Sequence, residues 1–165
     1  MNVLENFEFW LNSNNWIVKK NNGDFHLDKN HILFKYNNLF KNEFYIQFLK
    51  AFSMLENADG DKWFLLVNDF RNDYLDNEFA WNEFEKMSLE SENDKSERDE
   101  ISKWWAAYLP IYMSVKGSYS YYAMDVLNNV GSIIYGCEPV FEDSIVVANN
   151  FEDFLSKIIK GSISL

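Results

Sequence analysis

Alternation of apolar and polar residues is clearest between Leu109 and Val126. Two alternating runs, Leu109–Lys116 and Tyr119–Val126, are separated by Gly117-Ser118. A Gly-X pair between two such runs predicts a β-hairpin with a type II′ turn. That turn would place Met113 opposite Tyr122 on an apolar face. The other face would carry Tyr112, Ser114, Lys116, Tyr119, Tyr121 and Asp125.

The pattern after this hairpin predicts two further strands and a helix. Ser132–Tyr135 and Ser144–Ala148 are short apolar runs bounded by turn residues. Asn149 or Asn150 can cap a helix that Gly161 would end. Its apolar residues fall on one stripe and are Phe151, Phe154, Leu155, Ile158 and Ile159.

The N-terminal third predicts a helix, a strand and a second hairpin. Asn2–Asn14 has apolar residues at helical spacing, and Trp16–Val18 has an extended pattern. Phe25–Leu27 and Ile32–Phe34 flank a polar segment, and a turn at Lys29-Asn30 would pair them.

The middle of the chain predicts two more helices around a buried strand. A helical pattern begins after Asn42 and runs to Leu55. Lys62–Val67 is apolar enough for a central strand. Asn68-Asp69 can cap the next helix, whose apolar residues run with breaks through Phe70–Met87.

One further helix is expected before Pro110. Glu90–Glu100 has no apolar residue and is expected to be solvated, with Ser96 and Asp99 forming a capping box. The apolar face that follows is Ile101, Trp104, Trp105 and Tyr108. This order of elements predicts a single α+β domain over residues 1–165, with a mostly antiparallel sheet, a C-terminal meander and helices mainly on one side.

Charge limits the classes of partner. The formal net charge is −11 and the sequence pI is about 4.6. Nucleic acid and anionic membranes would repel such a chain, whereas a cationic protein would be attracted. The alternative is that the acidic surface only maintains solubility. Because Cys137 is the single cysteine and neither a signal peptide nor a membrane-spanning run is evident, we expect a cytoplasmic protein.

No metal site is predicted. Asn57–Asp61 resembles a calcium loop, but aligning Gly60 to the loop glycine puts Leu55 and Leu66 where carboxylates are needed. His26 and His31 have no cysteine nearby, so ordinary histidines are favoured over a zinc site.

Catalytic groups are also sparse, and we expect a protein that is not an enzyme and binds no cofactor. Cys137 could act as a nucleophile only if folding brought a distant histidine to it. Glu138, Glu142 and Asp143 surround Pro139, and paired carboxylates can catalyse proton transfer. A solvated loop is the simpler interpretation.

Two interpretations are open for Tyr112, Tyr119 and Tyr121. The helix that contains Trp104 and Trp105 could cover them. Alternatively, they form an exposed aromatic platform, flanked by Asp125 and the loop that contains Glu138, for a basic protein.

Several segments resemble the second half of the SUKH superfamily, which contains bacterial toxin-immunity proteins and a yeast cell-wall regulator. The resemblance covers residues 63–159. It is carried by Trp63–Leu66, Tyr108–Ile111, Tyr121–Asp125, the Ile-Ile-Tyr-Gly run at 133–136 and above all Val147–Leu155.

The resemblance implies a non-catalytic immunity protein that neutralises a cognate toxin, often a nuclease with a cationic surface. The alternative, which ranks second, is a regulatory or adaptor scaffold that binds a protein or peptide. No nucleic acid or membrane partner is expected. The predicted contact surface consists of Asp69, Asp73, Asp76, Tyr119, Tyr121, Glu138, Glu142 and Asp143.

Overall fold

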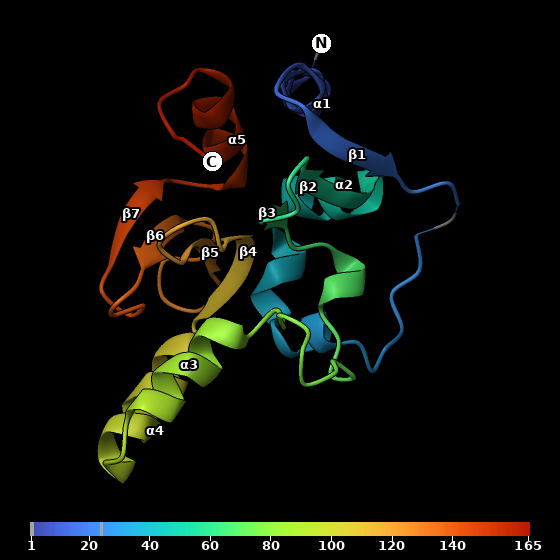
Figure 1. Ribbon diagram of the computed structural model, residues 1–165. Coiled ribbons are helices and arrows are strands. Elements are labelled where there is room, and N and C mark those ends of the chain that lie inside the picture. Colours follow the sequence, from blue (N-terminus) through green and yellow to red (C-terminus); the bar gives the residue numbers. More distant parts are fainter. Residues whose placement is uncertain (1, 24) are drawn as a thin grey trace.

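The computed structural model describes residues 2–23 and 25–165, and within them the chain forms one seven-stranded antiparallel sheet with five α-helices (Figure 1). The strands, which follow the sequence order across the sheet, are β1 (Trp16–Lys20), β2 (Phe52–Asn57), β3 (Lys62–Phe64), β4 (Tyr108–Ser114), β5 (Ser120–Asp125), β6 (Ile133–Cys137) and β7 (Ser144–Ala148). The helices are α1 (Val3–Ser13), α2 (Glu43–Ala51), α3 (Glu83–Ser91), α4 (Lys95–Trp105) and α5 (Phe151–Ile159), with short 3-10 helices η1 (Ile32–Lys35), η2 (Asn37–Lys41) and η3 (Val67–Asp69).

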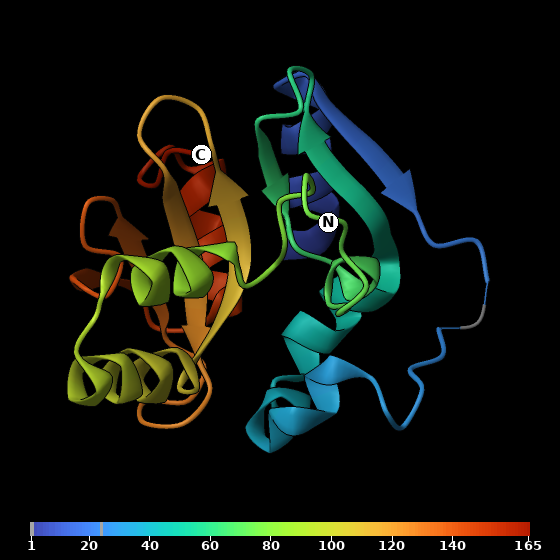
Figure 2. The ribbon, with the colours of Figure 1, turned by 60° about the horizontal axis from the view of Figure 1, so that its bottom comes forward.

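Helices lie on both faces of the sheet. α1, α2 and α5 pack together on one face, where Phe7, Phe48, Phe64 and Phe151 are buried against one another. α3 and α4 lie side by side over the opposite face of the C-terminal strands (Figure 2). The predicted α+β domain is confirmed, and three of the five helices share one side.

The meander has the predicted strands but not the predicted register. Met113 lies opposite Tyr121, one residue away from the expected pairing with Tyr122. The connection is a five-residue loop, Val115–Tyr119, because the Val115 amide donates to the carbonyl of Asp61 beside β3. An irregularity at Ile111 shifts the register again farther down the strand. Tyr121 therefore shares a face with Met113, since a one-residue shift exchanges the two faces.

The predicted terminal helices are confirmed. The Asn2 side chain accepts from the Glu5 amide at the start of α1. The Asn150 side chain accepts from the Asp153 amide at the start of α5, and Gly161 follows its end with a φ of 75°. A left-handed residue at this position is the usual helix stop.

The prediction of a hairpin between Phe25–Leu27 and Ile32–Phe34 is wrong. Ile32 begins η1, and the His31 ring accepts a hydrogen bond from the Leu33 amide, which caps this 3-10 helix. Phe25 and Leu27 lie in an irregular segment that packs against the core. The hydrogen bond from the Leu33 amide to the His31 side chain therefore favours a turn of 3-10 helix over strand pairing.

The predicted helix from Asn42 stops earlier than expected. α2 ends at Ala51 and the chain continues as β2. The amide group of Asn21, at the end of β1, donates to the carbonyls of Leu49, Lys50 and Phe52. These contacts satisfy carbonyls that a longer helix would have used, and they come from a residue 28 or more positions away.

The Phe70–Met87 helix is also shorter than predicted, and only α3 forms there. Ahead of it, the Arg71 guanidinium lies 3.9 Å from the centre of the Tyr74 ring, and the Tyr74 hydroxyl donates to the Asp69 carbonyl. α4 begins with Asp94 as its N-cap in place of Ser96. It ends at Trp105, which leaves Pro110 inside β4.

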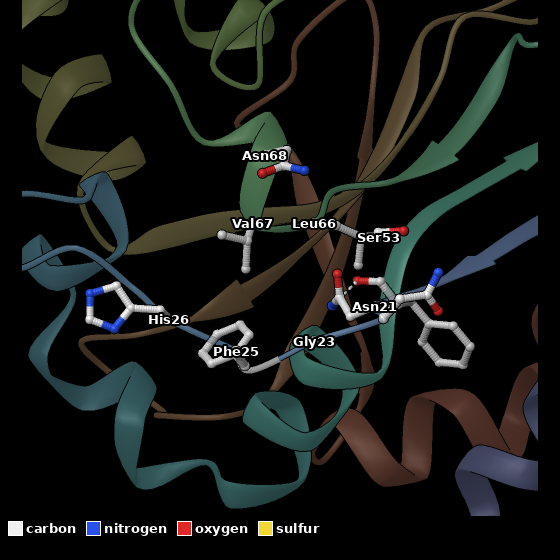
Figure 3. Close-up of a pocket in the computed structure, with 10 residues that line it drawn as sticks. Asn21, Gly23, Phe25, His26, Ser53, Leu66, Val67 and Asn68 are labelled. Carbon is white, nitrogen blue, oxygen red and sulfur yellow. Dashed lines mark hydrogen bonds between the residues drawn. The ribbon is translucent and has the colours of Figure 1, made fainter.

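β2 and β3 have the least backbone pairing of any two neighbouring strands in the sheet. Glu56 and Trp63 are the one residue pair that joins them among the described residues. Beyond this pair a hollow of about 180 Å³ separates β2 from the segment that follows β3. Figure 3 shows Leu66, Val67 and Asn68 on one side of this hollow and Phe25 and His26 on the other.

Candidate protein-binding surface

Tyr121 lies at the centre of an aromatic cluster beneath α3 and α4. Its side chain is 0% exposed, and its ring centre is 5.1 Å from that of Trp105 and 5.7 Å from that of Phe84. Its hydroxyl donates to the carbonyl of Phe141. Helices therefore cover Tyr121, and its assignment to an exposed platform is wrong. Tyr112, which was predicted on the same face, lies on the other face beside Phe64 and Tyr122.

Gly136 makes room for this arrangement. It lies directly opposite Tyr121 in the sheet, and a Cβ atom placed on it would stand 2.5 Å from Tyr121 Cζ. The tyrosine ring covers the bare backbone, as aromatic residues do beside strand glycines. The predicted strand Ser132–Tyr135 stops before Gly136, but this glycine is an interior residue of β6.

Two carboxylates lie at the edge of the cluster without a cationic partner. Glu142 accepts a hydrogen bond of 2.5 Å from the Trp105 indole nitrogen. Burial and the charge of Glu142 both raise the pKa of Glu85, which lies on α3. None of the ion pairs formed by the described residues includes either glutamate. An incoming ammonium or guanidinium group would relieve this repulsion.

Beside these carboxylates is a groove of about 540 Å³, which we call the α4 groove. It is lined by Glu97, Glu100, Ile101, Lys103, Trp104, Ala107, Tyr108, Leu127, Asn128, Val140 and Glu142. Leu127 and Val140 are 61% and 55% exposed, and Trp104 stacks near Tyr108 with ring centres 4.3 Å apart. Three glutamates against one lysine give the lining a formal charge of −2. The groove therefore combines apolar walls with an acidic rim.

Buried Asp125 fixes one wall of the groove. Its carboxylate accepts hydrogen bonds from the amides of Leu127, Asn128 and Asn129, at 2.8 to 3.0 Å. Its side chain is only 3% exposed. A loop held by three bonds to one carboxylate presents Leu127 in a fixed position, so binding there requires little ordering of the loop.

The predicted contact residues on the β6–β7 side lie around this cluster. Tyr119 is half-buried against Phe79, and its amide donates to the Glu138 carboxylate at 2.8 Å. Glu142 lines the α4 groove, and Asp143 is exposed in the same loop.

The three predicted aspartates after β3 do not join this group. Asp69 accepts from the Leu66 amide at 2.7 Å, so it serves the start of η3. Asp73 pairs with Arg71, and Asp76 is exposed. Within the described residues, no hydrogen bond or ion pair connects them to the loop of Glu138.

The sequence prediction missed Glu85, Glu97 and Glu100. Glu97, Glu100, Ile101 and Trp104 have the spacing i, i+3, i+4 and i+7, which places them on one helix face. That spacing was a usable signal. For Glu85 there was none, because its proximity to Glu142 depends on how the β6–β7 loop folds.

The hollow beside β2 offers little acid-base chemistry. His26 is the only titratable side chain among the ten described residues that line it (Figure 3). Across residues 2–23 and 25–165, no three His, Cys, Asp or Glu side chains are grouped so that they could hold a metal ion. Over the same residues, no helix has both the length and the apolar character to cross a bilayer.

No protein-family model matches the chain, and neither a curated protein nor a solved structure matches it.

Proposed function

We propose that this protein is a non-catalytic binding module that holds a cationic protein partner at the α4 groove. The observation that carries this proposal is the lining of the groove, which combines apolar side chains with glutamates. One of these, Glu142, lies near Glu85, and neither forms an ion pair with a cation among the described residues. A lysine or arginine side chain suits this site, because its charged end can meet the carboxylates while its aliphatic stem covers Trp104.

The charge of the whole chain supports the same partner. A net charge of −11 attracts a cationic protein over the Debye length of about 8 Å at physiological salt. Such steering raises association rates and makes them depend on ionic strength. The fixed groove then supplies the short-range apolar contacts that long-range charge cannot.

As to biological role, we propose an immunity protein that neutralises a cognate toxin in the cytoplasm of a bacterium. The resemblance of residues 63–159 to the SUKH superfamily supports this role. A nuclease toxin is cationic where it holds nucleic acid, so an acidic inhibitor can occupy that surface. An adaptor that binds a basic peptide would use the same groove without affecting survival.

Co-expression with toxin candidates encoded beside this gene tests the proposal. Survival of cells that make a toxin supports immunity, whereas a stable complex without survival favours the adaptor. If no neighbouring product binds, the proposed role is contradicted.

A paired variant tests the groove. We expect Glu97→Lys with Glu100→Lys to slow association about tenfold and to weaken its salt dependence. Glu43→Lys with Glu152→Lys is the matched control, because these exposed glutamates lie in the first turns of α2 and α5 on the other face. Equal effects of the two pairs would show that net charge acts without the groove.

A further inference from the structure

The two edges of the sheet are protected differently. β1 carries Lys19 and Lys20, and its register is interrupted between them. Lysines and bulges are common devices that keep an edge strand from pairing with other chains. β7, at the other edge, has no charged residue from Ser144 to Ala148, but its register with β6 is interrupted at Val147. The Val147 carbonyl also accepts a hydrogen bond of 2.9 Å from Lys157 Nζ, so the regular and unprotected part of this edge is Ser144–Val146.

Two neighbouring side chains of β7 are uncovered, one on each face, whereas Ala148 is buried. Ile145 and Val146 are 64% and 63% exposed, and successive strand residues point to opposite faces. Within the part of the chain that the structure describes, β7 pairs with β6 alone. An exposed apolar stretch at a sheet edge, here Ser144–Val146, is the kind of structure to which extended peptides bind by adding a strand.

We propose that an extended segment of the cationic partner adds to β7 as an eighth strand. This inference rests on the proposed function and extends its contact surface. The α4 groove and β7 are continuous, because Glu142 lines the groove and Ser144 begins the strand two residues later. Two residues span at most about 7 Å. One segment can therefore place a basic side chain near Glu142 and continue along β7.

A second copy of this chain is a poorer occupant. Two copies that each carry −11 repel one another, and β7 has only five residues. Pairing two such short edges leaves an interface below the roughly 1,200 Å² that stable complexes bury. The net negative charge that repels a second copy attracts a basic segment.

Amide hydrogen exchange of the full chain, followed by NMR, tests strand addition. The probe is a short end-blocked peptide of alternating arginine and valine at saturating concentration. We expect the β7 amides that point away from β6 to exchange at least about tenfold more slowly, which is about 1.4 kcal/mol. The same peptide with N-methyl groups along one edge keeps its charges and side chains but cannot pair, so this slowing should be lost.

The indole signals of Trp104 and Trp105 report the groove separately. If they shift and β7 exchange is unchanged, strand addition is overturned and the proposed function stands. If β7 is protected and the indoles do not shift, strand addition stands and the groove is wrong. Protection that grows with protein concentration and needs no peptide would identify a second copy and overturn the proposed occupant.

A pair of variants provides a further control. Val146→Asn should weaken peptide binding about tenfold, because asparagine is unfavourable in strands and removes the apolar contact. Ile17→Asn changes an exposed residue of the opposite edge strand and should leave binding within about twofold. Equal effects of the two substitutions would contradict the assignment of the edge.

Discussion

Replacing Gly136 with alanine would disturb the whole aromatic cluster beneath α3 and α4. The new Cβ atom would stand 2.5 Å from Tyr121 Cζ and 2.6 Å from Tyr121 Cε1. Carbon atoms in contact are ordinarily about 3.5 to 4.0 Å apart, so the ring has to move by about 1 Å. Trp105 and Phe84 pack against that ring, and its hydroxyl is bonded to the carbonyl of Phe141.

The cost follows from these contacts. Overpacking a core costs about 1 to 3 kcal/mol, and loss of the buried hydrogen bond adds about 1 kcal/mol. Alanine has less conformational freedom than glycine in the unfolded chain, and this stabilises the folded state by about 0.4 to 1 kcal/mol. We therefore expect Gly136→Ala to lower the free energy of unfolding by about 1 to 3.5 kcal/mol.

Equilibrium urea unfolding measures this change. Gly23→Ala is the matched control, because no atom lies within 4 Å of the Cβ position there, and its effect should stay within about 1 kcal/mol of zero. In a Tyr121→Leu background the cost of Gly136→Ala should fall by at least about 1 kcal/mol. If Gly136→Ala costs less than about 0.5 kcal/mol, the tyrosine ring does not occupy the position described.

Three other substitutions test separate contacts. Asp125→Ala removes the acceptor of three amide bonds and should lower the free energy of unfolding by about 2 to 3 kcal/mol, with faster amide exchange at Leu127–Asn129; unchanged exchange would contradict the role of Asp125. Tyr121→Phe should cost about 1 kcal/mol in urea unfolding, since only the bond to Phe141 is lost. Glu85→Gln should stabilise the chain at pH 7. The pKa of Glu85 is raised in the folded chain. The wild-type chain therefore loses stability as the pH rises from the ordinary glutamate pKa, about 4.3, through the folded value. Below that range the stability gained by the variant should vanish. A gain that is equal at every pH would refute this explanation.

The elements that the sequence predicted well are those with one buried side. α1 and α5 each have an apolar stripe, and their asparagine caps lie next to them in sequence. Ser144–Ala148 was predicted with its observed bounds because turn residues flank it. Here local signals and tertiary packing agree.

The errors arose where distant residues decide the local structure. Phe52 and Leu55 suit a helical stripe, but the Asn21 amide ends α2 before them. The register of β4 and β5 could not be obtained from alternation, since both faces of these strands are buried and apolar residues occupy each. In the candidate site, the cluster of carboxylates around Pro139 pointed to Glu142, the one of them that lines the α4 groove among the described residues. The register error placed Tyr112 on the same face as Tyr121, whereas Tyr112 pairs with Tyr122 on the other face.

Backbone pairing in the sheet is weakest between β2 and β3, where a single residue pair joins the two strands. β1 and β2 are attached to the remaining strands mainly through aromatic contacts of α1 and α2, such as those of Phe7 and Phe48 with Phe64, and hardly through backbone hydrogen bonds. Opening this N-terminal portion would break few strand bonds, but it would uncover the aromatic core that it shares with α5, where Phe48 packs against Phe151 with ring centres 4.8 Å apart. Side-chain packing, more than strand pairing, therefore holds the two parts of the sheet together.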